Sequence, residues 1–93
     1  MAKVEFSLTA IRDLDRLIRT HSLPGGTKAR LARSVLPLAR FPTIGHALGG
    51  TWDGFRFVLG PWRWMILVYA HLENENRVII VTIQDGRSSR FAG

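Results

Sequence analysis

The stretch GFRFVLGPWRWMILVY (residues 54–69) decides the fold, because it is apolar almost throughout and carries a Gly-Pro pair near its middle. Adjacent glycine and proline are typical of a turn. We therefore predict a strand over residues 52–59, a two-residue hairpin loop at Gly60-Pro61, and a second strand over residues 62–72. Two arginines, Arg56 and Arg63, stand inside this apolar hairpin and need an explanation.

The rest of the chain supplies two helices and two more strands. The apolar run VIIVTI (78–83) predicts a third strand over 77–83, after a four-residue loop at 73–76. Helical spacing of apolar residues predicts a helix over 8–21, capped by Ser7 or Thr9, and a second helix from about Thr27 that Pro37 kinks. We expect a short strand over 3–7, a turn over 22–26 and a loop over 41–50. The fold class is α+β, in the order β-α-α-β-β-β, with a mostly antiparallel sheet, both helices on one face, and a single domain over 1–93.

The length of the turn sets the register of the hairpin. A two-residue turn places Arg56 opposite Met65 and Val58 opposite Arg63, and strand residues alternate between faces. The face predicted to pack against the helices is Phe55, Phe57, Leu59, Trp62, Trp64, Ile66 and Val68. Arg56 and Arg63 then become diagonal neighbours on the opposite face. A three-residue loop would reverse the faces and separate the two arginines.

The next hairpin brings in a third arginine. Pairing Leu72 with Arg77 across the 73–76 loop returns the last strand to the same end of the sheet, where it delivers Arg87, with Arg90 just beyond. Arg56, Arg63 and Arg87 together predict an anion site, since gathered like charges need a counterion or solvent. The alternative is a set of solvated arginines whose stems cover an apolar sheet.

The charge balance also indicates an anionic partner. The chain carries 13 Lys and Arg against 7 Asp and Glu, and residues 1–50 hold eight basic and three acidic groups (8 − 3 = net +5). A polyanion or an acidic protein would suit this surface, and we take Lys28, Arg30, Arg33 and Arg90 as candidates for binding nucleic acid. Because all but two of the basic residues are arginine, codon usage in a GC-rich genome is an equally open explanation.

Several classes of protein are excluded by composition. With no cysteine there is no disulfide framework and no thiolate chemistry. The longest apolar run, residues 64–70, is far shorter than the roughly 20 residues that cross a bilayer, and the N-terminus lacks the apolar segment of a signal peptide. We expect a cytoplasmic protein that does not bind membranes. The three histidines are scattered and no phosphate-binding glycine loop is present, so we predict no metal and no cofactor.

The motifs resemble the RelE/ParE toxins of bacterial type II toxin–antitoxin modules. The segment ARFPTIGHALGG (39–50) is similar to the family's P-x-x-G-x-x-L loop, and residues 54–69 are similar to its G-x-R-x-x-x-G-x-x-R-x-x-x-x-Y pattern. The end DGRSSRF (85–91) stands where the family has a glycine or histidine, then an arginine, and often a tyrosine four residues later. The resemblance implies that Arg56, Arg63 and Arg87 stabilise a phosphate, and that a cognate antitoxin with a flexible segment wraps the toxin.

The resemblance leaves the target open. RelE-like members cut mRNA in the ribosomal A site, which needs a proton acceptor, a proton donor and positive charge at the phosphorus. Here the tyrosine and histidine positions are Phe91 and Gly86. His46 is the remaining acid/base candidate, because Tyr69 and His71 lie roughly 20 and 26 Å from Arg63 along the predicted strand. We assign Asp85 to an arginine partner and His21 to its helix dipole.

Three functions therefore stand side by side. The first is a ribosome-dependent, metal-independent mRNA endoribonuclease that inhibits translation and arrests growth. The second is a ParE-like toxin that inhibits DNA gyrase by binding. The third is a basic family member without nuclease activity. In each case we expect the antitoxin segment to be acidic, because the basic helices and exposed sheet edges would favour it.

Overall fold

Residues 1–87 are the part of the chain that the computed structural model describes, so the predicted roles of Arg90 and Phe91 lie outside it. The elements are β1 (Lys3–Phe6), α1 (Leu8–Thr20), α2 (Thr27–Ser34), α3 (Pro37–Arg40), β2 (His46–Ala47), β3 (Arg56–Leu59), β4 (Met65–Leu72) and β5 (Arg77–Asp85), with short 3₁₀ helices at Gly50–Trp52 and Glu73–Glu75. The α+β prediction and the order of its main elements are confirmed. The boundaries differ most at 52–55 and 62–64, which precede the strands instead of belonging to them.

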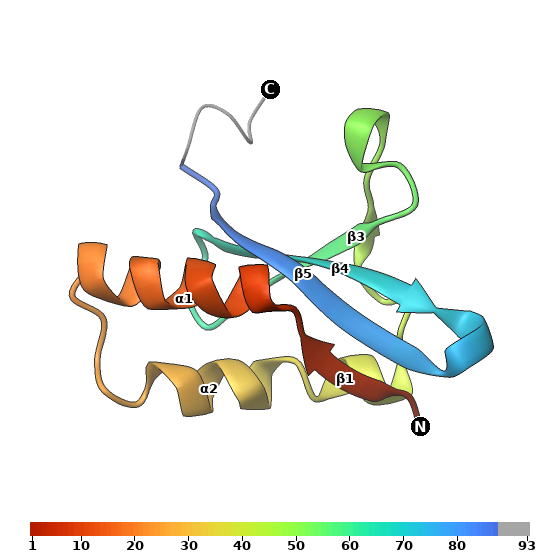
Figure 1. Cartoon of the computed structure of the whole chain (residues 1–93), viewed down its shortest axis with the longest axis horizontal. Coiled ribbons are helices and arrows are strands. Elements are labelled where there is room, and N and C mark those ends of the chain that lie inside the picture. The colour runs from red at the N-terminus through yellow and green to blue at the C-terminus, as the bar shows by residue number, and fades with distance from the viewer. Residues whose placement is uncertain (88–93) are drawn as a thin grey trace.

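The sheet runs in the order β1-β5-β4-β3-β2. Only the β1–β5 pair is parallel, and the other three pairs are antiparallel. Helices α1 and α2 pack on one side of this sheet (Figure 1). None of the helices within residues 1–87 has the length and apolar character needed to cross a bilayer.

The helices begin and end where local chemistry allows. Ser7 caps α1, because its hydroxyl accepts a hydrogen bond from the Ala10 N–H at 3.0 Å. The second predicted helix is divided in two. α2 ends at Ser34 and α3 begins at Pro37, because proline has no N–H to continue the hydrogen-bond ladder but is favourable in a first turn.

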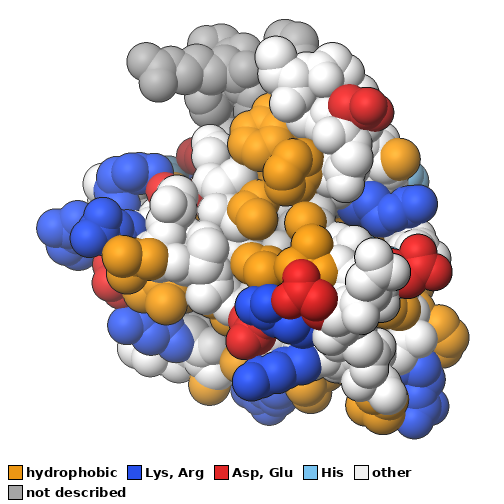
Figure 2. Space-filling model, turned by 45° about the vertical axis from the view of Figure 1, so that its right-hand side comes forward, with side chains coloured by type: hydrophobic (Ala, Val, Ile, Leu, Met, Phe, Trp, Pro, Cys, Tyr) orange, Lys and Arg blue, Asp and Glu red, His pale blue; other side chains and the backbone are white. Residues whose placement is uncertain are grey.

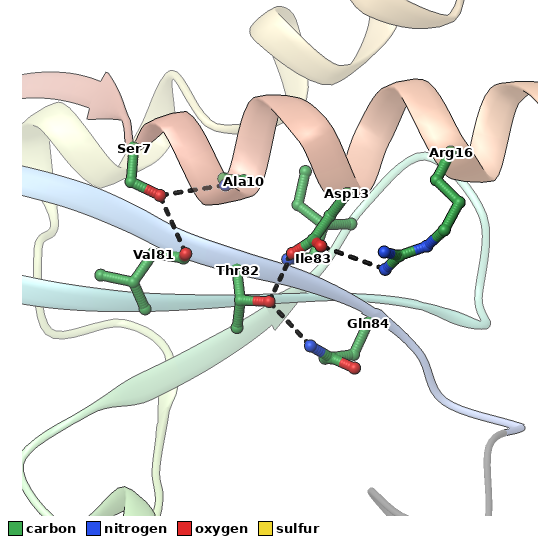
Figure 3. Close-up of polar contacts among 8 residues, drawn as sticks. All are labelled: Ser7, Ala10, Asp13, Arg16, Val81, Thr82, Ile83 and Gln84. Carbon is green, nitrogen blue, oxygen red and sulfur yellow. Dashed lines mark hydrogen bonds and ion pairs between the residues drawn. The ribbon is translucent and has the colours of Figure 1, made fainter.

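Helix α1 also completes the hydrogen bonding along the edge of β5. Beyond Phe6 the chain leaves the sheet, yet Ser7 N–H still donates to the Ile80 carbonyl at 2.9 Å. The buried carboxylate of Asp13 then accepts bonds from the Ile83 N–H at 3.0 Å and the Thr82 hydroxyl at 2.5 Å (Figure 3). Asp13 therefore replaces a missing strand partner, which explains a buried acid in the middle of a helix.

The face of the sheet that packs against the helices is the opposite of the predicted one. Met65, Leu67 and Tyr69 of β4 are completely buried in the core. The core also contains Val78, Ile80 and Ile83 of β5 and Ala10, Leu14, Leu17, Leu31, Val35 and Leu38 of the helices. Both faces of these strands are apolar, so alternation could not say which face the helices cover.

The loop between β3 and β4 has five residues, 60–64, and the predicted two-residue turn at Gly60-Pro61 is wrong. Leu59 lies opposite Ile66, and Arg56 lies opposite Tyr69. The longer loop lets Trp62 and Trp64 leave the strand and pack against the core from its end. Burying the two indoles in this way favours the longer connection.

Candidate functional site

Arg56, the first residue of β3, is half-buried at one end of that strand. Its guanidinium donates to the carbonyls of Gly45 at 2.9 Å and Thr43 at 3.2 Å. Arg56 pairs with Tyr69 of β4, whereas Asp85, at the end of β5, pairs with Met65 of β4. Tyr69 and Met65 are four residues apart, or about 13 Å along the strand. The predicted neighbourhood of Arg56 with Arg63 and Arg87 is therefore not formed, because the five-residue loop moves Arg63 out of the strand.

Tyr69 binds the same loop through its hydroxyl group. Its hydroxyl oxygen accepts a hydrogen bond from the Gly45 N–H at 3.0 Å, and the whole side chain is buried. Burial raises the pKa of Tyr69 above its usual value, while the bond from Gly45 acts in the opposite direction. We name Gly45, Arg56 and Tyr69 the loop anchor. Its geometry is that of a structural brace.

His46 belongs to this end as well. Its ring stacks on Phe57, with centroids 5.3 Å apart, in the two-residue edge strand β2. Strands β3 and β4 lie between β2 and β5, so about 14 Å of sheet separates His46 from the strand that leads to Arg87. The structure thus places the acid/base candidate beside Arg56 only.

Arg87 lies beside the loop that contains Arg63, at the other end of β3. The pairing of Leu72 with Arg77 is confirmed, and β5 returns so that Gly86 N–H donates to the Trp64 carbonyl at 2.6 Å. Arg87 therefore reaches the loop that contains Arg63, as the second hairpin predicted. Arg63 is exposed, and no carboxylate within residues 1–87 forms an ion pair with it.

Arg87 contacts Asp85 of β5 and the indole ring of Trp64. Its Nε and Nη2 donate to the two carboxylate oxygens of Asp85 at 3.0 and 3.1 Å, and its Cζ lies 4.8 Å from the Trp64 ring centre. These hydrogen bonds from Arg87 lower the pKa of Asp85 below its usual value. The predicted pairing of Asp85 with an arginine is confirmed.

His21 joins this group, which the sequence did not reveal. Its Nε2 lies 3.3 Å from Asp85 Oδ2, and its ring centre lies 4.6 Å from that of Trp64. We name His21, Trp64, Asp85 and Arg87 the Trp64 cluster. The sequence assigned His21 to its helix dipole alone and gave no sign of a contact with Asp85. The contact forms because α1 runs alongside β5. The helix is about 20 Å long and the neighbouring part of the strand about 17 Å, so His21 at the end of α1 lies near Asp85 at the end of β5.

The helices add more arginine beside the same loop. Arg30 stacks on Trp62 with its Cζ 4.6 Å from the ring centre, and Trp62 stacks on Trp64 with centroids 6.4 Å apart. Arg33 lines a shallow hollow together with Arg30 and Pro61. We name Arg30, Arg33, Trp62, Arg63, Trp64 and Arg87 the arginine–tryptophan surface. It combines indole rings with guanidinium groups from three separate parts of the chain.

Lys28 lies elsewhere. Its ammonium pairs with Asp15 at 3.1 Å, in a hollow lined also by Arg12 and Arg19. Of the four residues predicted to bind nucleic acid, the structure therefore brings Arg30 and Arg33 to the loop with Arg63, and Lys28 stays apart. Within residues 1–87 no three side chains are arranged to hold a metal ion.

Comparison with known families settles the class of protein. Residues 4–90 match the family model described as "ParE toxin of type II toxin-antitoxin system, parDE". The chain belongs to this toxin family. The resemblance to RelE/ParE toxins is thereby confirmed. No sequence among the curated proteins matches the toxin.

Solved structures show the same fold at low sequence identity. A chain of the toxin–antitoxin complex RelBE2 from Mycobacterium tuberculosis is 24% identical, with a TM-score of 0.69, over 90% of this toxin and 96% of that chain. A chain of the chromosomal ParDE system of P. aeruginosa is 19% identical, with a TM-score of 0.68, over 91% of this toxin and 96% of that chain. A chain of the E. coli RelBE complex is 11% identical, with a TM-score of 0.66, over 95% of this toxin and 100% of that chain.

The toxin departs from the RelE pattern at Gly86 for a visible reason. A Cβ placed there would lie 2.9 Å from Ile66 Cδ1 and 3.2 Å from the Trp64 carbonyl oxygen. The Ile66 methyl would have to move aside, and the contact with the Trp64 carbonyl would be tighter than usual. The close approach that brings Arg87 to Trp64 therefore favours glycine before it.

Proposed function

We propose that this toxin is a ribosome-dependent, metal-independent mRNA endoribonuclease that inhibits translation. The observation that carries the proposal is the arginine–tryptophan surface. Arg87 places its guanidinium over the Trp64 ring, and Arg63 is an exposed arginine directly before Trp64 in the chain. A guanidinium fork suits the phosphate group, and an indole offers a stacking surface for a base.

The electrostatics of this surface suit a phosphoryl reaction. Arg87 is oriented in advance by its two bonds to Asp85, and more than half of its side chain, 59%, remains exposed to a ligand. Preorganised positive charge of this kind stabilises the negative charge that develops at phosphorus during cleavage. Arg56 takes no part in this version of the site, because its donors are directed at the Thr43 and Gly45 carbonyls.

A cognate antitoxin is the second partner in this proposal. The structural neighbours include the toxin–antitoxin complexes RelBE2 and RelBE. The helical side exposes large apolar residues among its arginines: Leu8, Ile11, Leu36 and Phe41. Figure 2, in which the right-hand side of Figure 1 comes forward, shows hydrophobic side chains gathered near the middle of that face, above a group of charged side chains. An acidic, amphipathic segment that folds on binding would suit such surfaces, and both partners would be met in the cytoplasm.

Inhibition of DNA gyrase by binding is the second candidate. One observation favours it: the loop anchor uses Arg56 for structure, so the three-arginine phosphate site implied by the resemblance is incomplete. The matching family is also the one named for ParE. A toxin that only binds its target needs no proton-transfer group.

Induction in cells separates the two candidates. We expect growth arrest with transcript cleavage that disappears when translation of the transcript is blocked, and unchanged plasmid supercoiling. With purified ribosomes and mRNA, Arg63→Ala and Arg87→Ala should each slow cleavage about 100-fold or more. Arg12→Ala is the matched control, because Arg12 is exposed on α1 and lies outside the arginine–tryptophan surface.

The opposite pattern overturns the proposal. Loss of gyrase supercoiling activity with intact transcripts would establish the gyrase candidate. Cleavage that survives both substitutions would place the phosphate site elsewhere. A chain that produces neither effect would be a family member without either activity.

A further inference from the structure

The proposed cleavage lacks a proton-transfer group at the positions that the resemblance indicates. Gly86 has no side chain, and it lies close to Ile66 and Trp64. His46 lies at the far edge of the sheet, stacked on Phe57. Tyr69 is buried and bonded to Gly45. A guanidinium is a poor proton acceptor, because its pKa exceeds about 12.

We propose that His21 is the catalytic proton acceptor of this toxin, held in place by Asp85 within the Trp64 cluster. The inference rests on the endoribonuclease function proposed above and names one further catalytic residue for it. The residue comes from the end of α1, outside the motifs that carry the family resemblance.

The geometry is that of a histidine oriented by a carboxylate. Asp85 Oδ2 lies 3.3 Å from His21 Nε2 and 3.1 Å from Arg87 Nη2, so one oxygen joins the imidazole to the phosphate-binding arginine. Nε2 is the ring nitrogen that lies within ion-pair distance of the carboxylate, so we assign the proton to Nε2 and the role of proton acceptor to Nδ1. A base that is itself oriented by a third group is the arrangement that activates a hydroxyl nucleophile.

The side chain of His21 is not needed to end the helix. The capping bond of α1 comes from the backbone, where His21 N–H donates to the Leu17 carbonyl at 3.0 Å. The imidazole instead turns to β5 and packs on Trp64, with 30% of the side chain exposed. A group that is both oriented and accessible is suited to proton transfer with a bound ligand.

The step balances without any further reagent. The proton of the ribose 2′-hydroxyl passes to Nδ1 of His21 as the O2′–P bond forms. The P–O5′ bond breaks and leaves a 2′,3′-cyclic phosphate on the upstream fragment. The departing 5′-oxygen takes a proton from water, and the imidazolium later returns its proton to solvent. Arg87 and Arg63 would stabilise the charge at phosphorus.

The pH dependence of cleavage tests this role. Asp85 and Arg87 are the charged groups that face the imidazole, the first directly and the second through the shared oxygen. A general base acts in its unprotonated form. The single-turnover cleavage rate of the ribosome-bound toxin should therefore rise with pH until the base carries no proton, and then level off.

His21→Gln is the central variant. We expect its cleavage rate to fall about 10²–10⁴-fold, with loss of the rise with pH and unchanged affinity for ribosomes. His71→Gln is the matched control, because His71 lies at the opposite end of β4, facing Val78, and should keep the wild-type pH profile. Asp85→Asn should slow cleavage less than His21→Gln.

Chemical rescue keeps the test valid even if a variant folds poorly. Free imidazole should restore part of the cleavage activity of His21→Ala, which it cannot do for a folding defect. Wild-type rate and pH profile in His21→Gln, or no rescue of a folded His21→Ala, would overturn the role of His21 while leaving the endoribonuclease function intact. If the wild-type toxin leaves transcripts uncut and blocks gyrase, both proposals fail together.

Discussion

The loop anchor and the Trp64 cluster use the same residue types to different ends. Arg56 and Tyr69 both bond to backbone atoms of one loop, and the phenol is sealed from water. Arg87 and His21 share one side-chain carboxylate and stay partly exposed. A guanidinium directed at carbonyls stabilises a fold, whereas one balanced by a single acid at the surface can still receive a phosphate. Sequence position within a family motif does not tell these uses apart.

The largest expected effect lies in the loop anchor, at Gly45. A Cβ there would lie 2.6 Å from the Phe57 carbonyl oxygen and 2.7 Å from the Tyr69 hydroxyl, so the loop and the sheet would be forced apart. We expect Gly45→Ala to lower the free energy of unfolding by about 3 kcal/mol, measured by denaturant titration. Gly25→Ala is the control, because nothing lies within 4 Å of its added Cβ. Equal stability of the two variants would contradict the anchor.

The second prediction contrasts two arginines. Arg56→Ala should cost about 2 kcal/mol of stability, because bonds from a charged donor to the loop carbonyls are lost. Arg87→Ala should cost clearly less stability than Arg56→Ala, because solvent screens its exposed ion pair, yet it should abolish toxicity. Denaturant unfolding and growth after induction measure the two effects. The contrast fails if Arg87→Ala proves the more destabilising of the two.

The third prediction concerns the phenol of Tyr69. The chain has one tyrosine, so the ultraviolet absorbance of tyrosinate reports this residue alone. Burial raises the pKa of Tyr69 above 10.0. Since the unfolded chain then ionises first, the stability that the neutral phenol contributes is complete below pH 10 and is lost as pH rises further. Tyr69→Phe should lack this alkaline loss. Tyrosinate appearing in the folded toxin below pH 10 would show that the phenol is not sealed.

The smallest expected effect lies in the Trp64 cluster. Hydrogen bonds from Arg87 lower the pKa of Asp85 below 3.8, so the folded state prefers the carboxylate. Its contribution to stability is present above about pH 4 and is lost as pH falls through the lowered value. Solvent screens this exposed pair, so the free-energy difference between wild type and Asp85→Asn should be modest and should shrink between pH 5 and 2. A difference that stays constant over that interval would contradict the ion pair.

The sequence predicted the parts of the site that depend on local pattern. The return of β5 was predicted from the 73–76 loop, and with it the meeting of Arg87 with the loop that holds Arg63. The predicted two-residue hairpin at Gly60-Pro61 is wrong, because a Gly-Pro pair marks a turn without fixing its length. In the longer loop, Trp62 and Trp64 are partly buried against the core. Arg56 was then assigned to the wrong neighbours.

Pattern and capping chemistry by themselves determined the α+β class, the order of the elements and the antiparallel return of the last strand, because each depends on residues close together in the chain. Only the tertiary structure decided which face of the sheet the helices cover, since both faces are apolar. It also decided that Arg56 anchors a loop and that His21 meets Asp85. Such contacts join residues far apart in the sequence, and their geometry follows from how a helix and a strand pack, which no local spacing records.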